Sequence, residues 1–156
     1  MRIITDSREQ ARLIFPQVEG VEYETHALPV GDYGAYLTGE IIMYPTVFER
    51  KGSDLFSSFS HGYAKEKKKI EKAKNLGLKY ILAVEGTAFD IREGHRYQKD
   101  GEEHWSKKDG LSQVRQLLTC NIKGYFDIWW CKSRQEMAFL IQEYFLACQR
   151  LKNEAS

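Results

Sequence analysis

Residues 49–54 read Glu49-Arg50-Lys51-Gly52-Ser53-Asp54 and follow the apolar, β-branched run 41–48. This run predicts a strand over 41–49 that ends in charge at the rim of a sheet. Because side chains alternate along a strand, Glu49 and Lys51 point to one face of the sheet and Arg50 points to the other. Such charges occur on solvated strand faces as well as at functional sites, so a second feature is needed to separate the two interpretations.

That second feature is a carboxylate upstream. Asp32 lies at the base of the predicted strand 33–37, which a turn about Gly39 joins to the next strand. Simple pairing about that turn leaves Asp32 a few residues away from the position opposite Glu49. Pro45 cannot donate a hydrogen bond to the ladder, so we expect a bulge there that shortens the offset. The sequence therefore favours a shared site for the two carboxylates.

Two carboxylates and an ammonium gathered at one place suit the hydrolysis of a phosphodiester with the help of a divalent metal. Carboxylate oxygens bind hard cations such as Mg²⁺ or Mn²⁺. The bound cation lowers the pKa of a water ligand and offsets the charge that builds on the phosphate. An ammonium such as that of Lys51 can orient the water or stabilise the developing oxyanion.

Further motifs occur in an order that resembles a known family. In chain order they are Asp6-Ser7-Arg8-Glu9 after the apolar residues 3–5, Gly31-Asp32, Glu49-Arg50-Lys51, a helix start at 54–58, a strand at 80–86 and the segment 133–138. Together they resemble the nuclease domain of the XPF, Hef and Mus-type structure-specific endonucleases, and the likeness covers almost the whole chain.

The resemblance implies an α/β fold of the restriction-endonuclease-like type, with a mixed β-sheet flanked by helices in one domain over 1–152 and a tail at 153–156. It implies an endonuclease that uses Mg²⁺ or Mn²⁺ to cleave DNA, in branched, flapped or forked substrates. The metal ligands carried over are Asp32 and Glu49. The catalytic residues carried over are Asp6, Arg8, Glu9, Asp32, Glu49, Arg50, Lys51 and Asp54.

Four of these positions, Asp54 and the three within residues 6–9, also have a purely structural interpretation. The family has three residues between its lysine and its last aspartate, whereas this chain has only Gly52 and Ser53 there. Ser53 is a typical helix N-cap, and Asp54 would then lie near the positive end of that helix. Residues 6–9 would likewise suit a polar loop after the first strand.

Basic residues are concentrated in one segment although the net charge is only +1. The basic block spans residues 65–79, and on a helix Ile70, Ala73 and Leu76 would occupy the inner face. The lysines would then lie on the outer face, either solvated or in contact with phosphates of a nucleic acid. The candidate contacts are Lys65, Lys67, Lys68, Lys69 and Lys72.

The polar stretch 87–109 predicts a long loop in which aromatic and basic residues alternate with acids. Arg96, Tyr97 and Trp105 are candidates for stacking on bases and touching phosphates. The alternative is a surface loop without a binding role. His95 and His104 are too far apart in sequence for a local metal pair.

The remaining elements alternate along the chain. We expect strands at 2–5, 21–27, 33–37, 41–49, 78–85 and 125–131, helices at 54–75, 111–122 and 133–152, and a helical or irregular piece at 9–15. This order predicts a mixed sheet in one domain, which suits a chain of 156 residues. The three cysteines form no metal pattern and are expected to be buried free thiols.

Location and partners follow from the same features. No run is long enough to span a bilayer and no signal peptide is evident, so a cytoplasmic or nucleoid-associated protein with no membrane contact is expected. The apolar stripe of the last helix, with the resemblance, implies a homodimer or heterodimer through the C-terminal region. The alternatives to a DNA endonuclease are a catalytically inactive nuclease-fold subunit that binds or scaffolds DNA, and an RNA nuclease or small-substrate phosphodiesterase.

Overall fold

A computed structural model describes residues 1–59, 62–99, 102–106 and 110–155, and for residues 95–99 and 102–106 it describes the backbone. Its centre is a six-stranded sheet in the order β2-β1-β3-β4-β5-β8. The strands of this sheet are β1 (Arg2–Asp6), β2 (Glu22–His26), β3 (Tyr33–Tyr36), β4 (Thr46–Lys51), β5 (Lys79–Glu85) and β8 (Asp127–Cys131).

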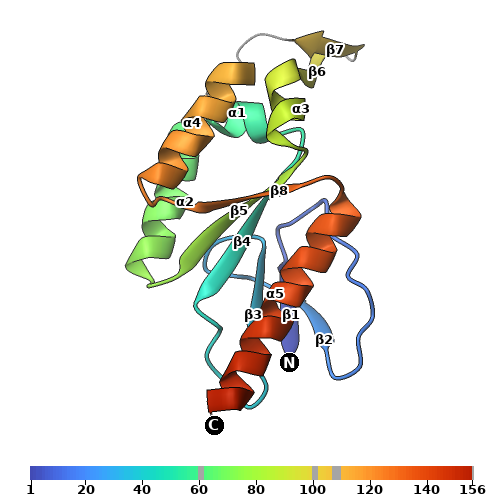
Figure 1. Cartoon of the computed structure of the whole chain (residues 1–156), viewed down its shortest axis with the longest axis vertical. Coiled ribbons are helices and arrows are strands. Elements are labelled where there is room, and N and C mark those ends of the chain that lie inside the picture. The colour runs from blue at the N-terminus through green and yellow to red at the C-terminus, as the bar shows by residue number, and fades with distance from the viewer. Residues whose placement is uncertain (60–61, 100–101, 107–109, 156) are drawn as a thin grey trace.

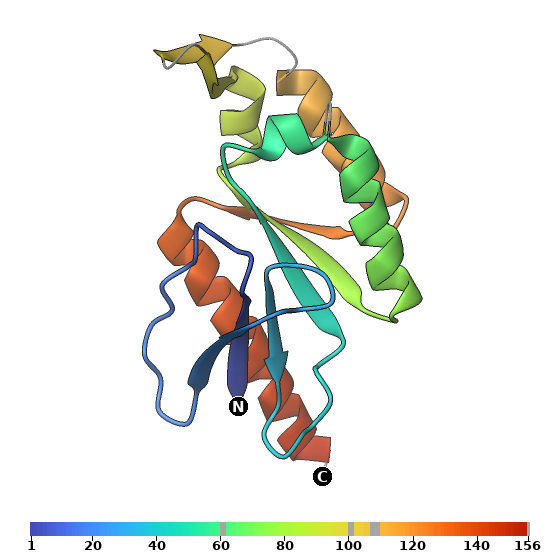
Figure 2. The same cartoon turned by 180° about the vertical axis from the view of Figure 1, so that it is seen from behind.

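The sheet is mixed, as predicted from the sequence. β1 pairs with β2 in parallel and with β3 antiparallel, and β3 pairs antiparallel with β4. The half that contains β4, β5 and β8 is parallel. Helix α5 (Arg134–Ala155) covers one face, and α1 (Leu55–Phe59), α2 (Tyr63–Asn75) and α4 (Gly110–Ile122) lie on the other (Figures 1 and 2).

The alternation of side chains along β4 sends them into two separate cores. Val47 packs with the residues of α1, α2 and α4, whereas Phe48 packs with those of α5. Both faces of the strand are covered, so its side chains from Thr46 to Glu49 and that of Lys51 are all buried. Charged groups at the end of this strand are therefore held in the protein rather than in water.

The strand predicted at 41–49 begins only at Thr46. This later start determines how β4 pairs with β3. Ile41 and Ile42 are 91% and 75% exposed, so the apolar run before the strand is a connection and not a core segment. The Thr46 N–H donates to the Tyr44 carbonyl at 2.7 Å, which is the bond of a tight three-residue turn around Pro45. This turn takes the place of the bulge that we expected there.

The helix predicted at 54–75 is two helices, α1 and α2. Gly62 precedes α2, and a Cβ on this residue would lie 3.0 Å from the carbonyl oxygen of Ser57. The close approach of the two backbones requires the glycine, and glycine also disfavours a continuous helix. The break lets α1 and α2 cover different parts of the sheet.

The loop predicted at 87–109 contains regular structure. Helix α3 (Ala88–Glu93) begins at a capping box in which the side chains of Thr87 and Asp90 bind each other's backbone N–H. β6 (His95–Lys99) and β7 (Glu102–Ser106) then form a separate antiparallel pair beyond α3 at one end of the molecule (Figure 1). The polar and aromatic residues that suggested a loop are therefore largely in the strands β6 and β7.

The remaining predicted elements lie within a few residues of the observed ones, and α5 extends to Ala155. Cys120, Cys131 and Cys148 are buried free thiols, as expected. Among the described helices, none has the length and apolar character that crossing a membrane requires.

Candidate active site

β4 delivers its charged residues to the two faces in the predicted way. Glu49 and Lys51 point toward α2, where the Lys51 ammonium lies 3.1 Å from the Glu49 carboxylate. Arg50 points to the opposite face and lies 3.5 Å from Glu9 and 3.9 Å from Glu85. Glu49 and Lys51 are only 2% and 3% exposed, which excludes the solvated-face interpretation.

The register of β3 and β4 brings Asp32 to the position opposite Glu49. Tyr33 pairs with Phe48, and the Asp32 N–H donates to the Phe48 carbonyl at 2.7 Å. The Asp32 carboxylate in turn accepts from the Arg50 N–H at 2.8 Å. The two carboxylates therefore belong to residues that lie opposite each other on neighbouring segments of chain.

Gly31 makes this approach possible. Its φ of +81° lies in the region that favours glycine, and a Cβ here would meet the Val47 side chain at 3.0 Å and the Phe48 carbonyl at 3.1 Å. The Gly-Asp dipeptide thus has a structural reason: the glycine turns the backbone against β4, and the aspartate follows directly.

Helix α2 adds a carboxylate and an ammonium that the sequence interpretation did not place here. Glu66 is buried and accepts from the Lys51 ammonium at 2.9 Å. Lys69, one turn later, binds Glu49 in a short contact and lies 3.6 Å from Glu66. The strand and the helix therefore each contribute one carboxylate and one ammonium group to the same cluster.

The pKa values of Asp32 and Lys51 are both raised, although burial acts on the two groups in opposite directions. Burial, followed by the negative charge of Glu49, raises the pKa of Asp32 to about 8. For Lys51, burial lowers the pKa, but the charges of Glu49 and Glu66 outweigh it and the pKa is raised. Burial and the neighbouring carboxylate thus favour the protonated form of Asp32, whereas the carboxylates around Lys51 favour its charged form.

These groups line an open hollow of about 650 Å³ at the end of β4. Of the eight candidate catalytic residues, seven line it: Arg8, Glu9, Asp32, Glu49, Arg50, Lys51 and Asp54. The convergence predicted from the motifs is thus present in the structure.

Asp6 is the exception, because its carboxylate is fully engaged in the scaffold. It accepts from the Arg8 backbone and guanidinium at 2.7–2.8 Å and from the Leu28 N–H at 2.6 Å. Burial alone would raise the pKa of Asp6, but these hydrogen bonds, led by that from the Arg8 side chain, lower it to about 2. Asp6 fixes Arg8 at the edge of the hollow and is not free to bind a ligand.

Asp54 is both a residue at the start of a helix and a neighbour of the candidate site, the two interpretations considered from the sequence. It directly precedes α1, and its carboxylate accepts from the Gly52 N–H at 3.0 Å. The same side chain is half exposed and lies 3.6 Å from the Lys51 ammonium. The shortened spacing therefore leaves Asp54 at the mouth of the hollow rather than at its centre.

The candidate nucleic-acid contacts are divided among several places. Lys65 and Lys69 line the hollow, Lys68 and Lys72 are exposed on α2, and Lys67 points into a different hollow. Arg96 and Tyr97 belong to β6 and Trp105 to β7, and their side chains lie outside the described part of the structure. Lys69 is the one whose predicted role changes most, because it is an ion-pair partner of Glu49.

A signal for Glu66 was present in the sequence. It precedes Ile70 by four residues and Ala73 by seven, so a helix with those two on its inner face also buries Glu66. Leu76, assigned to that face from the sequence, is instead 50% exposed beyond the end of α2. A buried glutamate on a lysine-rich helix requires partners, and Lys51 and Lys69 supply them.

The donor set suits a hard divalent cation with few protein ligands. Glu49 Oε2 and Glu66 Oε2 are buried and accept no hydrogen bond from any described residue. Within the described residues, no three acidic, histidine or cysteine side chains are arranged to hold a metal. Mg²⁺ is commonly held by one or two carboxylates together with waters and substrate phosphates, so Asp32 and Glu49 fit such an ion.

Comparisons with known proteins are consistent with this geometry. A family model described as the ERCC4 domain matches residues 5–144. Among solved structures, XPF from Aeropyrum pernix is similar with a TM-score of 0.63 and 18% sequence identity, over 99% of this chain and 69% of that chain. At this identity the likeness concerns the fold. None of the curated proteins matches the sequence.

Proposed function

Because the chain belongs to the ERCC4 domain family, we propose that it is a divalent-metal-dependent endonuclease that hydrolyses phosphodiester bonds in branched, flapped or forked DNA. One observation carries the proposal: Asp32, Glu49 and Lys51 meet in a single hollow, although Asp32 comes from a separate segment of chain. One buried oxygen of Glu49 has no hydrogen-bond partner among the described residues. Such an atom is costly to bury unless a ligand completes it.

Asp32 and Glu49 would hold Mg²⁺ or Mn²⁺, which when bound lowers the pKa of water and offsets charge on the phosphate. Lys51 acts as a fixed cation, because its raised pKa keeps the ammonium charged at neutral pH. A positive group held by Glu49 and Glu66 stabilises the negative charge that develops in the transition state without having to reorganise.

The arginines have supporting roles in this proposal. Arg50 braces Glu9 and Glu85 on the face opposite the hollow's lysines, and its backbone N–H orients Asp32. Arg8 is held by Asp6 but keeps a largely exposed side chain at the edge of the hollow, where it can contact phosphate. Lys65, Lys68 and Lys72 would position the nucleic acid through its backbone rather than its bases.

Cleavage of labelled forked DNA with Mg²⁺ or Mn²⁺ tests the proposal directly. We expect Lys51→Ala to lose roughly 100-fold to 1,000-fold in rate, as for the loss of a transition-state charge contact, and Asp32→Asn to lose at least as much. Glu22→Gln and Lys132→Ala, which change the same types of group at exposed positions, serve as controls with wild-type rates.

The outcomes separate the alternatives. Undiminished cleavage by both site variants would remove the mechanism. Binding of forked DNA by the wild type without cleavage in either metal would favour an inactive DNA-binding subunit. A parallel series with single-stranded RNA and linear DNA assigns the polymer, because faster cleavage of RNA would exclude DNA as the preferred substrate.

A further inference from the structure

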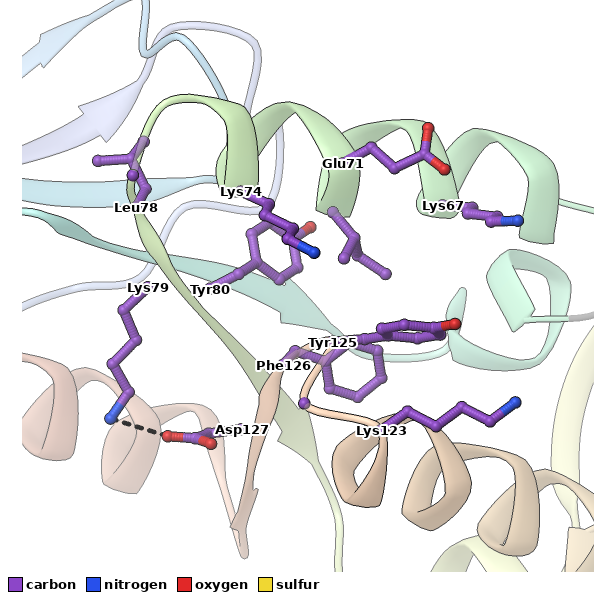
Figure 3. Close-up of a pocket in the computed structure, with 13 residues that line it drawn as sticks. Lys67, Glu71, Lys74, Leu78, Lys79, Tyr80, Lys123, Tyr125, Phe126 and Asp127 are labelled. Carbon is purple, nitrogen blue, oxygen red and sulfur yellow. Dashed lines mark ion pairs between the residues drawn. The ribbon is translucent and has the colours of Figure 1, made fainter.

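A second hollow of about 630 Å³ lies on the other side of α2 (Figure 3). Its upper wall is α2, with Lys67, Glu71 and Lys74, and its lower wall is the segment 123–127 that connects α4 to β8. The size is within the range of roughly 300–1,000 Å³ that is usual for ligand sites. None of the candidate catalytic residues lines it.

The helical period explains why α2 serves both hollows. At 100° per residue, Lys65, Lys68, Lys69 and Lys72 fall on one side of the buried ridge formed by Glu66, Ile70 and Ala73. Lys67, Glu71 and Lys74 fall on the opposite side. The helix thus has two separate charged edges, one at the candidate active site and one at the second hollow.

The second hollow carries an excess of positive charge. Lys79 and Asp127 form an ion pair of 2.8 Å at one end and neutralise each other. Lys67, Lys74 and Lys123 have no ion pair with any residue that the structure describes, and Glu71 is the remaining acid of the lining. Three lysines against one glutamate leave two positive charges in a protein whose net charge is +1.

Aromatic rings separate the lysines of the two walls. Tyr80 and Phe126 are buried at the base, and the ring of Tyr125 lies between Lys123 and α2 with 38% of the residue exposed (Figure 3). An exposed tyrosine between cations presents a flat apolar face within reach of positive charge. A free phosphate ion can interact with the lysines but not stack on the tyrosine ring, whereas a nucleotide chain can do both through its phosphates and bases.

Tyr80 connects this hollow to the candidate active site. Its ring lines the hollow, and its buried hydroxyl lies near the Glu49 carboxylate. Burial, followed by the charges of Glu49 and Glu66, raises the pKa of Tyr80 well above its usual range. The side chain of Tyr80 therefore lines the second hollow while lying within electrostatic reach of Glu49 and Glu66.

We propose that the second hollow binds a single-stranded segment of nucleic acid, with a base on Tyr125 and phosphates at Lys67, Lys74 and Lys123. The proposal takes a nucleic-acid substrate, as in the proposed function, as its premise. It adds a site for an unpaired arm on the side of α2 away from the catalytic groups. The lysines recognise the backbone and Tyr125 recognises any base, so the site has little sequence preference.

Binding without cleavage tests this site separately from catalysis. Fluorescence anisotropy with a short labelled oligothymidylate, in EDTA, compares the wild type with Lys74→Gln/Lys123→Gln and with Tyr125→Leu. We expect each variant to bind about tenfold more weakly, and the double variant to lower the slope of log K against log salt by about 1.4. An oligouridylate of the same length decides between DNA and RNA as the strand that binds.

The matched control is Lys132→Gln/Arg150→Gln, which removes the same charge from exposed positions near the start and end of α5 and should bind as the wild type does. The proposal is overturned if this control weakens binding as much as the hollow variants do, or if Tyr125→Leu binds normally. Equal binding of a polyglutamate peptide would also overturn it, because that would make the site a general polyanion surface. Loss of cleavage in Asp32→Asn with unchanged oligothymidylate binding would show that strand binding does not require the candidate catalytic groups.

Discussion

Glu49 has one oxygen bound by two ammonium groups and another without a hydrogen-bond partner among the described residues. Lys51 is fully enclosed, but Lys69 is 31% exposed and reaches Glu49 from α2. A divalent cation at Asp32 and Glu49 would therefore meet repulsion from the Lys69 ammonium at close range. Lys69 would therefore compete with the proposed metal for the Glu49 carboxylate.

Removing this competitor should strengthen metal binding. We expect Lys69→Gln to bind Mn²⁺ several-fold more tightly than the wild type in a calorimetric titration without nucleic acid. Lys72→Gln removes an equal charge from an exposed site on the same helix, and its effect should be small because solvent and salt screen it. Equal or weaker Mn²⁺ affinity in Lys69→Gln would contradict the competition.

Asp6 provides a test of the scaffold beneath the site. Its folded-state pKa of about 2 lies below the ordinary value of 3.8, so its ionised form is stabilised by folding. That contribution is fully present above the unfolded pKa and is lost as the pH falls through the folded value. A difference of this size corresponds to about 2 kcal/mol.

We therefore expect Asp6→Asn to lower the free energy of unfolding by about 2 kcal/mol at pH 7, and by much less at pH 2, where the wild-type carboxylate is becoming protonated. Urea denaturation at the two pH values measures the difference. Glu22→Gln is the control, since its side chain is exposed on β2. A loss that is the same at both pH values would assign the effect of Asp6 to packing instead of charge.

At the scale of elements, the contact of β3 with β4 determines whether the site exists. Gly31 and Gly39 both have positive φ, +81° and +79°, but a Cβ would clash only at Gly31, since nothing described lies within 4 Å at Gly39. Alanine at either position would be destabilised by roughly 1–2 kcal/mol because a residue with a Cβ disfavours the left-handed backbone conformation. Only at Gly31 does it also push against Val47 and Phe48.

We expect Gly31→Ala to be less stable than Gly39→Ala by a further 1–3 kcal/mol or so in urea denaturation, the usual range for overpacking. Gly31→Ala should also lose Mn²⁺ affinity, because Asp32 is the next residue. If the two variants are equally stable, the close approach at Gly31 is not what positions Asp32.

The elements also show what the sequence could predict and why the rest was missed. Strand alternation was enough to place Glu49 and Lys51 opposite Arg50, because the period of a strand is local. The exposure of Ile41 and Ile42 was not predictable in this way, since an apolar run does not reveal where a tight turn will interrupt it. Lys69 was predicted to contact nucleic acid, and its ion pair with Glu49 was missed because Glu49 is twenty residues earlier in sequence and is brought close only by packing.

At the scale of the whole molecule, α5 covers one face of the sheet but leaves apolar side chains on its outer side. Phe139 and Leu151 are 50% and 64% exposed, while Met137, Ile141 and Phe145 of the same helix are buried. Single exposed apolar side chains are common on protein surfaces. These two are candidates for a dimer contact because the sequence led us to expect pairing through the C-terminal region. We propose that a second copy of the chain covers them.

Sedimentation equilibrium tests this dimer. The wild type should sediment as a dimer at micromolar concentration, and Phe139→Asp should shift it to a monomer by placing a charge in the contact. Asn75→Asp, which adds the same charge at the end of α2, should leave the dimer unchanged. A wild type that is monomeric at high concentration would rule out self-association through α5.

The tight turn at Tyr44–Thr46 has a practical consequence for the segment before it. The Tyr44 N–H is anchored to the Ala35 carbonyl, and the strand that carries Glu49 starts afresh after Pro45. The number of residues between Glu40 and Met43 therefore does not affect the geometry of the candidate catalytic groups. A peptide tag or a fluorescent reporter inserted between Ile41 and Ile42 would therefore allow the protein to be detected in solution without changing the geometry of the candidate site.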